Sequence, residues 1–352
     1  MPEQSKCLIQ SPVVSAAASI SSGNLRLHAN ESPFRLPDRV AEQIGQACAD
    51  LALNRYPDEL APAFYQALSD RLQVPTEMLL AGNGSDELIL LLLMAYGRLG
   101  KVLLPSPSFS MYKQCAESLR LCPEEMPLTS DWQLDLPLIL QAAGQEPGLI
   151  FVCRPNNPTG NLFARADLLR LLQQTQLTVV VDEAYSEFSG DSLLPELAAH
   201  PRLIILRTLS KAYGLAGIRL GYLVAQPAMV KAVDRVRSPF NLNSLSLAVG
   251  RIALLHGDQL LASVPQICAE RNWLSAELAA LPAVTVFPSV TNFLLLRLPV
   301  PAAPIWSRLR QRGIMVRLLA GLDDCLRISV GQRRENLRLL AVLRQALVEE
   351  GY

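Results

Sequence analysis

The sequence predicts an α/β protein with a mainly parallel sheet and a second, smaller α+β domain. Between about residues 40 and 290, short apolar runs alternate with helical patterns, and several runs are continuously apolar. Such runs are typical of strands covered by helices on both faces. After about residue 255, the pattern changes to a long helix, short strands and a closing amphipathic helix. Half of the 352 residues are hydrophobic, so the chain can bury a large core.

The strands expected in the first region are short runs rich in Leu, Ile and Val. They lie at 101–104, 149–153, 178–181, 203–206 and 220–224. A helix is expected between them at 165–174. The apolar run at 88–96 is far shorter than the ~20 residues of a membrane-spanning helix, and it predicts a buried helix. Gly82 and Gly84 precede that helix, and Ser85 is suited to cap it.

The second region is predicted to contain its own helices and strands. We expect helices at 259–281 and 335–349, and strands at 284–286, 292–298, 314–317 and 325–329. The predicted organisation is an N-terminal arm (1–33), a large domain (34–250) and a small C-terminal domain (251–352).

Composition and charge argue against several classes of protein. Lys+Arg and Asp+Glu balance at 32 each, which gives no support for a nucleic-acid partner. The seven cysteines are scattered singly without a CxxC pair, and free thiols fit a reducing cytoplasm. Gln10, Ser11 and Pro12 interrupt the apolar start, so a signal peptide is not expected, and no membrane association is expected either. The three histidines show no metal spacing, and surface or capping roles are expected for them.

Three charged residues at wide spacing indicate a cofactor site. Asp182 ends the apolar run 178–181, Lys211 follows 29 positions later, and Arg219 follows eight positions after Lys211. A lysine can form a Schiff base with an aldehyde, an aspartate can pair with a pyridine nitrogen, and an arginine can bind a phosphate. The hypothesis is a pyridoxal-phosphate enzyme with all three groups at strand ends.

Other residues fit the same strand-end cofactor site, but each also has an ordinary structural explanation. Gly84 and Ser85 at a helix N-terminus are suited to a phosphate, although a plain helix start is equally compatible. Asn157 lies in the turn 156–160 and can point toward this site, or it can simply belong to a tight turn. Thr208 and Ser210 supply hydroxyls beside Lys211.

Two arginines interrupt apolar strands in the small domain. Arg317 follows 314–316, and Arg327 lies within 326–328. An arginine in such a strand is costly unless it is paired. Either Asp323 or Asp324 is its partner, or the arginine binds an anionic substrate.

The motifs together resemble those of fold-type I pyridoxal-phosphate-dependent aminotransferases, and most closely the histidinol-phosphate aminotransferase family. The resemblance runs from about residue 25 to the C-terminus. It is carried by the segments 27–34, 55–58, 82–87, 107–112, 156–160, 182–188, 207–222, 237–241, 291–293 and 326–331. Several segments are shared by the wider superfamily, but their order and spacing are specific. The resemblance implies a seven-stranded sheet sandwiched by helices in the large domain.

The resemblance also implies roles for individual residues. Lys211 looks like the Schiff-base lysine and proton carrier, and Asp182 like the partner of the pyridine nitrogen. The other cofactor contacts that it implies are Tyr56, Gly84, Ser85, Asp86, Phe109, Asn157, Tyr185, Thr208, Ser210 and Arg219, with Asn157 and Tyr185 at the ring oxygen and Phe109 stacked on the ring. Tyr56 resembles a residue that reaches the neighbouring subunit's site, which implies a homodimer. Arg327 and Arg317, with Asn157, look like the substrate contacts.

The implied activity is transamination between L-histidinol phosphate and 2-oxoglutarate in histidine biosynthesis. One departure concerns the substrate, because residues 1–30 lack the aromatic residue that this family often carries in its arm, and Ser11–Val14 are expected in its place. An aromatic or broad-range aminotransferase therefore remains an alternative, as does a threonine-phosphate decarboxylase of the same fold. A regulator without turnover is disfavoured, because the chain has no spare length for a DNA-binding domain. A dinucleotide binder is disfavoured, because the motif at 82–87 lacks a third glycine.

Overall fold

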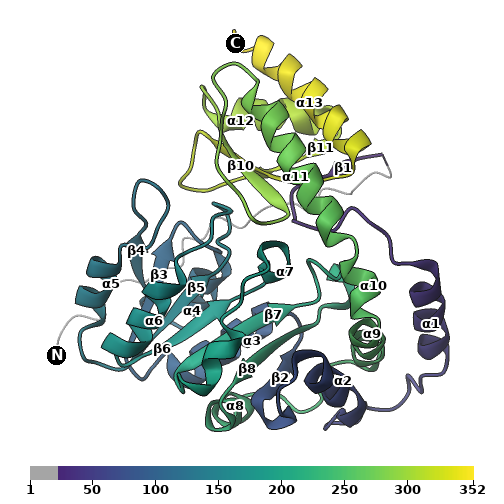
Figure 1. The fold of residues 1–352 in the computed structure, drawn as a ribbon, viewed down its shortest axis with the longest axis vertical. Coiled ribbons are helices and arrows are strands. Elements are labelled where there is room, and N and C mark those ends of the chain that lie inside the picture. Colours follow the sequence, from purple (N-terminus) through teal and green to yellow (C-terminus); the bar gives the residue numbers. More distant parts are fainter. Residues whose placement is uncertain (1–22) are drawn as a thin grey trace.

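The computed structural model describes residues 23–352, and it is built around a seven-stranded sheet. The strand order is β2-β8-β7-β6-β5-β3-β4. The pairs from β4 through β3, β5 and β6 to β7 are parallel, whereas β8 is antiparallel to both of its neighbours. The predicted fold class, a mainly parallel sheet with an additional small domain, is confirmed. Figure 1 shows the large sheet with its helices below the smaller sheet and α11, α12 and α13.

Several strands of the large sheet end in residues that line the cavity of the site. Their bounds are β2 Leu79–Gly82, β3 Lys101–Ser106, β4 Glu124–Pro127, β5 Gly148–Cys153, β6 Leu177–Asp182, β7 Leu203–Thr208 and β8 Gly221–Ala225. Every residue of β5 and β6 is buried, which agrees with their continuously apolar sequences. Parallel β3, β5, β6 and β7 bring their carboxyl ends to one edge of the sheet.

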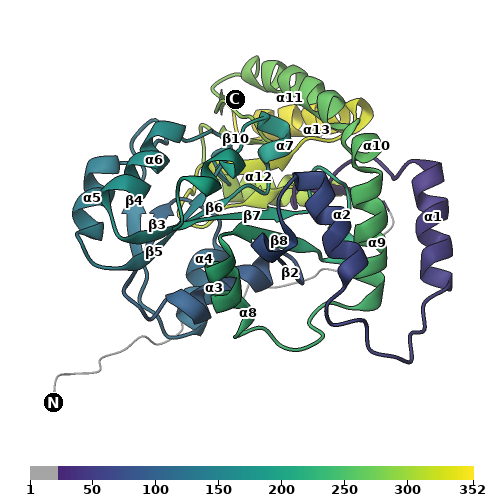
Figure 2. The same cartoon turned by 60° about the horizontal axis from the view of Figure 1, so that its bottom comes forward.

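Helices cover both faces of this sheet (Figure 2). One buried cluster packs the sheet against α3 Ser85–Tyr96, α4 Met111–Ser118 and α8 Pro227–Asp234. The opposite cluster includes α1 Asp38–Ala49, α2 Pro62–Leu72, α5 Leu136–Ala143, α6 Arg165–Gln174 and α9 Ser244–Leu255. The short helix α7 Ser186–Ser189 follows β6. Burial on both faces supplies the main stabilisation of the sheet.

The C-terminal part forms its own core. A four-stranded sheet has the order β12-β13-β10-β9, with β9 Thr285–Val286, β10 Phe293–Arg297, β12 Arg317–Leu318 and β13 Cys325–Ser329. The helices of this part are α10 Gly257–Leu261, α11 Val264–Ala279, α12 Ala302–Gln311 and α13 Arg333–Val348. Strand β1 Leu25–Arg26 pairs with β11 Ile314–Met315, so the segment before the large domain is anchored on the small one. The proposed boundaries at residues 33 and 250 remain predictions.

Several elements differ from the expectations. Strands β2 and β4 were missed because they are short edges of the sheet, and β4 consists of Glu-Glu-Met-Pro. The helix predicted at 259–281 is divided into α10 and α11, because Pro265 in the first turn of α11 has no N–H for a continuous helix. The strand predicted at 314–317 is divided between β11 and β12, which belong to different sheets. Ser85 is the first residue of α3 rather than its cap, and Gly84 takes the capping position without a side-chain hydrogen bond.

Within residues 23–352, no helix is both long and apolar enough to span a membrane. The six cysteines of this range are all free thiols, as expected. Cys7 and the segment Ser11–Val14 lie outside the described residues.

Candidate active site

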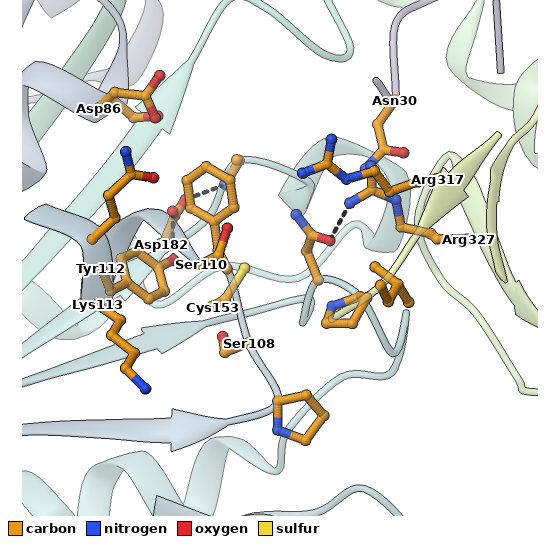
Figure 3. Close-up of a pocket in the computed structure, with 18 of the residues that line it drawn as sticks. Asn30, Asp86, Ser108, Ser110, Tyr112, Lys113, Cys153, Asp182, Arg317 and Arg327 are labelled. Carbon is orange, nitrogen blue, oxygen red and sulfur yellow. Dashed lines mark hydrogen bonds between the residues drawn. The ribbon is translucent and has the colours of Figure 1, made fainter. Parts of the chain in front are cut away.

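A cavity of about 700 Å³ opens at the carboxyl ends of the parallel strands. Its walls come from the large sheet, the N-terminus of α3, the segment 28–30 and the small domain. The residues predicted for the site that line it are Ser85, Asp86, Phe109, Asn157, Asp182, Tyr185, Thr208, Ser210, Lys211, Arg219, Arg317 and Arg327. Figure 3 shows Arg317, Arg327 and Asn30 together on one side of the cavity and Asp86, Tyr112 and Asp182 on the other. Residues that are far apart in the sequence therefore form one site.

Lys211 lines this cavity. It follows β7, and its Nζ donates a 2.9 Å hydrogen bond to the carbonyl oxygen of Ala29. Burial, reinforced by the positive charge of Arg327, lowers the pKa of Lys211 to about 8. A substantial fraction of the amine is therefore uncharged just above neutral pH, as a nucleophile or a proton acceptor requires.

Asp182 ends β6 and is only 2% exposed. Its Oδ2 accepts a 2.7 Å hydrogen bond from the hydroxyl of Tyr112, and its Oδ1 accepts one of 3.0 Å from the Ala184 amide. Burial raises the pKa of Asp182 to about 6, although both hydrogen bonds oppose that rise. Asp182 is not a helix cap, since α7 begins only at Ser186. A buried carboxylate with a raised pKa and no cationic hydrogen-bond partner among the described residues is suited to a cationic ligand.

The end of the cavity formed by the N-terminus of α3 is suited to an anion. Helix α3 begins at Ser85, so the amides of Ser85 and Asp86 lie in its first turn. Gly84 has φ +85°, and a Cβ there would lie 2.8 Å from an Nη atom of Arg219. Thr208 and Ser210 share a 2.9 Å hydroxyl–hydroxyl hydrogen bond. Arg219 contacts Asp86 at 2.9 Å, and both side chains are partly exposed.

Arg327 occupies the small-domain wall and is oriented without any carboxylate. Its Nη1 donates to Asn157 Oδ1 at 2.6 Å, and its Nη2 donates to the His28 carbonyl oxygen at 2.7 Å. Its buried Nε has no partner among the described residues. Burial lowers the pKa of Arg327 to about 10. The acidic alternative does not hold for Arg327, because its hydrogen-bond partners among the described residues are Asn157 and the His28 carbonyl, and Asp324 pairs with Arg297 at 3.1 Å.

Comparison with known proteins decides the family. Residues 22–343 match the family model "Aminotransferase class I and II". The chain belongs to this family. It is 42% identical over 336 residues to histidinol-phosphate aminotransferase 1 of Burkholderia lata, covering 93% of each chain. It is 40% identical to histidinol-phosphate aminotransferase of Chromobacterium violaceum, covering 93% of this chain and 94% of the relative.

A solved structure gives the same picture for the fold. Histidinol-phosphate aminotransferase from Sinorhizobium meliloti, in complex with pyridoxal-5'-phosphate, superposes with a TM-score of 0.85 at 28% identity. The match covers 93% of this chain and 92% of that one. This aminotransferase therefore has both the sequence motifs and the backbone arrangement of its family.

Two predicted residues do not line the cavity of this aminotransferase, and several lining residues were missed. Gly84 lies just behind the wall, and Tyr56 is 82% exposed, where it stacks on Phe240 with ring centroids 4.8 Å apart. The missed residues that hydrogen-bond to predicted site residues include Tyr112, Asn30 and His28. His28 was expected at the surface or in a cap, but it is half-buried in the cavity wall, where burial lowers its pKa. All three lay in segments that carried the resemblance, Tyr112 in 107–112 and the other two in 27–34, but no role in the site was assigned to them.

Proposed function

We propose that this protein is a histidinol-phosphate aminotransferase that exchanges an amino group between L-histidinol phosphate and 2-oxoglutarate in histidine biosynthesis. The observation that carries the proposal is the set of Lys211, Asp182 and Arg327 around one cavity. Relatives with this name, at about 40% identity over nearly the whole chain, support the choice of substrate.

The residues present fit pyridoxal phosphate. Lys211 offers a buried amine whose lowered pKa favours reaction with an aldehyde. Burial disfavours the ionised form of the Asp182 carboxyl, so pairing with a protonated pyridine nitrogen would offset the desolvation cost of that carboxylate. The first-turn amides of Ser85 and Asp86, with Gly84, Thr208, Ser210 and Arg219, are arranged for the phosphate. Phe109 lies against the same cavity, where its ring can cover that of the cofactor.

Tyr185 and Asn157 complete the cofactor contacts in the proposal. Both line the cavity, and the Asn157 amide lies 3.5 Å from the Tyr185 hydroxyl. We assign both to the ring oxygen. Asn157 also contacts Arg327, so it links the cofactor contacts to the substrate contacts.

Each residue of the site then has a separate role in the reaction. When bound, pyridoxal phosphate supplies an aldehyde that accepts the donor's amino group and a ring that holds the electrons released with its proton. Lys211 Nζ takes that proton from the donor carbon and returns it, acting first as a base and then as an acid. Asp182 keeps the ring nitrogen protonated. Arg327, with Arg317, holds the substrate anion and fixes its orientation.

The two substrates place different anions on the same arginines. Histidinol phosphate has no carboxylate, so its phosphate takes Arg327 and Arg317 in one half-reaction. The α-carboxylate of glutamate takes them in the other. Guanidinium groups suit both anions, because they pair in a bidentate manner with carboxylates and phosphates.

We further propose a cytoplasmic homodimer in which Tyr56 of one subunit reaches the cofactor phosphate of the other. Tyr56, Leu53 and Leu60 are strongly exposed in the single chain, as an apolar contact surface would be. The free thiols support a reducing compartment. The division into an arm (1–33), a large domain (34–250) and a small domain (251–352) belongs to the same proposal and is supported by the separate buried cores.

A half-reaction on the cofactor-loaded protein tests the proposed function. L-histidinol phosphate is added without a keto acid, and the visible absorbance of the bound cofactor is followed. We expect rapid loss of this absorbance and its return on addition of 2-oxoglutarate. Lys211→Ala serves as the control and should show no turnover.

Other outcomes would replace the proposed substrate. A response to phenylalanine or tyrosine, but not to histidinol phosphate, would indicate an aromatic aminotransferase. Release of carbon dioxide from threonine phosphate would indicate the decarboxylase. Turnover by Lys211→Ala would contradict the assignment of Lys211.

A further inference from the structure

Asn30 is a buried residue in the segment that links β1 to the large domain, and it is 1% exposed. It adopts φ +53°, in the left-handed region that asparagine tolerates better than most residues. Its carbonyl oxygen accepts a 3.0 Å hydrogen bond from Asn292 Nδ2, which ties it to the small domain. Its side chain points the other way, and Nδ2 donates to the hydroxyl of Tyr185 at 2.9 Å. The residue therefore bridges the two parts of the protein at the cavity wall (Figure 3).

The orientation of the Asn30 amide is set by Ser329. Ser329 Oγ accepts a 2.8 Å hydrogen bond from the Asn30 backbone N–H, and its own hydroxyl proton goes to Asn30 Oδ1 at 3.2 Å. If the amide were turned over, this buried hydroxyl proton would lose the only acceptor found for it among residues 23–352, which is unfavourable for a buried donor. Asn30 Nδ2 therefore faces Tyr185.

A second chain of hydrogen bonds also ends with a donor at the Tyr185 hydroxyl. The guanidinium of Arg327 can only donate, and it donates to Asn157 Oδ1 at 2.6 Å. This contact turns Asn157 Nδ2 toward Tyr185, where it lies 3.5 Å from the hydroxyl. Both neighbouring amides thus present donors to the Tyr185 oxygen.

The consequence concerns the single proton of the Tyr185 hydroxyl. The oxygen accepts from Asn30, and no protein acceptor for its proton is found among the described residues. Burial raises the pKa of Tyr185, so the proton is retained at neutral pH. The remaining direction is the cavity that Tyr185 lines.

We infer that Asn30 is a positioning residue that makes Tyr185 a hydrogen-bond donor into the cavity, toward the ring oxygen of the cofactor. The inference rests on the proposed function, because it takes pyridoxal phosphate as the ligand that supplies the acceptor. A donor at that oxygen spreads its negative charge, so the Lys211 nitrogen joined to the cofactor holds its proton less tightly. Asn30 thereby tunes the acidity of this nitrogen through Tyr185.

Spectroscopic pH titration of the cofactor-loaded protein tests this inference. The midpoint of the change in the visible band reports the proton on the Lys211 nitrogen. Tyr185→Phe removes the donor, and we expect its midpoint to rise by about one pH unit. Asn30→Asp has the same shape but cannot donate, so Tyr185 turns its proton toward the new carboxylate, and the midpoint should rise by about as much. Asn30→Ala offers no acceptor but no longer restrains the Tyr185 hydroxyl, so its midpoint should rise by only a fraction of that shift.

A double variant distinguishes reorientation of the Tyr185 hydroxyl from a direct electrostatic effect of the introduced carboxylate. If the carboxylate introduced by Asn30→Asp acts by turning the Tyr185 hydroxyl, the midpoint of Asn30→Asp combined with Tyr185→Phe should equal that of Tyr185→Phe alone. Additive shifts, or an unchanged midpoint in Asn30→Asp, would overturn the inference.

Ser329→Ala provides a milder test should Asn30→Asp fail to fold. It frees the Asn30 amide to turn over, and we expect part of the Tyr185→Phe shift. A wild-type midpoint in this variant would also overturn the inference. Failure of cofactor binding, on which the proposed function depends, looks different, since the wild-type protein would then show no cofactor band at all, whereas a different substrate would leave the titration unchanged.

Discussion

Tyr112 and Asp182, 70 positions apart, form a buried 2.7 Å hydrogen bond from the phenol to the carboxylate. The phenol is held by α4, and the carboxylate ends β6. Tyr112 also stacks on Phe151 of β5, with ring centroids 5.0 Å apart, which holds its hydroxyl in place. This contact opposes the effect of burial on Asp182, whose pKa nevertheless rises to about 6. Without a cationic ligand, the ionised carboxylate of Asp182 therefore destabilises the folded state.

The cofactor-free protein should therefore lose stability as the pH rises through about 6. The folded-state pKa of Asp182 is raised, so its contribution is present at low pH and is lost as the carboxyl ionises. Asp182→Asn removes this loss, and we expect the cofactor-free variant to be more stable than wild type at pH 7.5 by about 2 kcal/mol. Denaturant unfolding at pH 5 and pH 7.5 measures the difference. The same variant should bind pyridoxal phosphate weakly, and an equal pH dependence in both proteins would refute the explanation.

The rate of cofactor association should follow the titration of Lys211. Only the uncharged amine attacks an aldehyde, and the pKa of Lys211 is lowered to about 8. The rate should rise about tenfold per pH unit below this value and level off above it. Stopped-flow absorbance after mixing with pyridoxal phosphate measures the rate, with Lys211→Ala as the blank. A rate still rising steeply above pH 9 would mean that the amine is not desolvated as the structure indicates.

Arg327→Lys should impair both half-reactions. The lysine keeps the charge but loses the two-nitrogen geometry that contacts Asn157 and the His28 carbonyl. We expect kcat/KM to fall by about 100-fold for both histidinol phosphate and 2-oxoglutarate. Arg297→Lys is the matched control, because Arg297 lies on the adjacent strand β10 and pairs with Asp324 outside the cavity. Similar losses in both variants would point to general damage to the small domain.

Gly84→Ala should weaken both the fold and cofactor binding. Gly84 has φ +85°, and a Cβ there would meet the guanidinium of Arg219 at 2.8 Å. We expect destabilisation of about 2 kcal/mol and a lower affinity for pyridoxal phosphate. Gly45→Ala is the control, because Gly45 lies within α1 with open space around it. That variant should gain about 0.5–1 kcal/mol, and a loss as large as that of Gly84→Ala would contradict the argument.

A mixture of two inactive variants tests the role of Tyr56 in the neighbouring subunit. Lys211→Ala and Tyr56→Ala are each expected to have little activity. After subunit exchange, a mixed dimer carries both defects in one site and none in the other. Activity should then return to roughly a quarter of the wild-type value at equal mixing. No recovery, despite mixed dimers detected by native mass spectrometry, would place Tyr56 at its own subunit's site.

Local sequence patterns were sufficient for the central elements. The apolar run at 149–153 predicted β5 to within one residue, and the helix at 165–174 was predicted at its observed bounds. Asp182, Lys211 and Arg219 could be grouped because each lies at a strand end. Asp182 ends β6, Lys211 follows β7, and Arg219 precedes β8, whose first residue pairs with the last residue of β7. The two edge strands were not predicted, for different reasons. Strand β2 has only four residues and ends in Ala-Gly, whereas β4 is mostly exposed and carries two glutamates.

The sequence by itself therefore determined the fold class, the cofactor chemistry and the strand-end residues, because these depend on backbone periodicity and residue type. Only the tertiary structure decided which distant groups touch. Lys211 meets the carbonyl of Ala29 across 182 positions, and Asn30 meets Ser329 across 299. No periodic pattern encodes such contacts, since they arise when the segment before the large domain is packed between the two cores. The direction of each hydrogen bond, and with it the proton of Tyr185, follows from that packing.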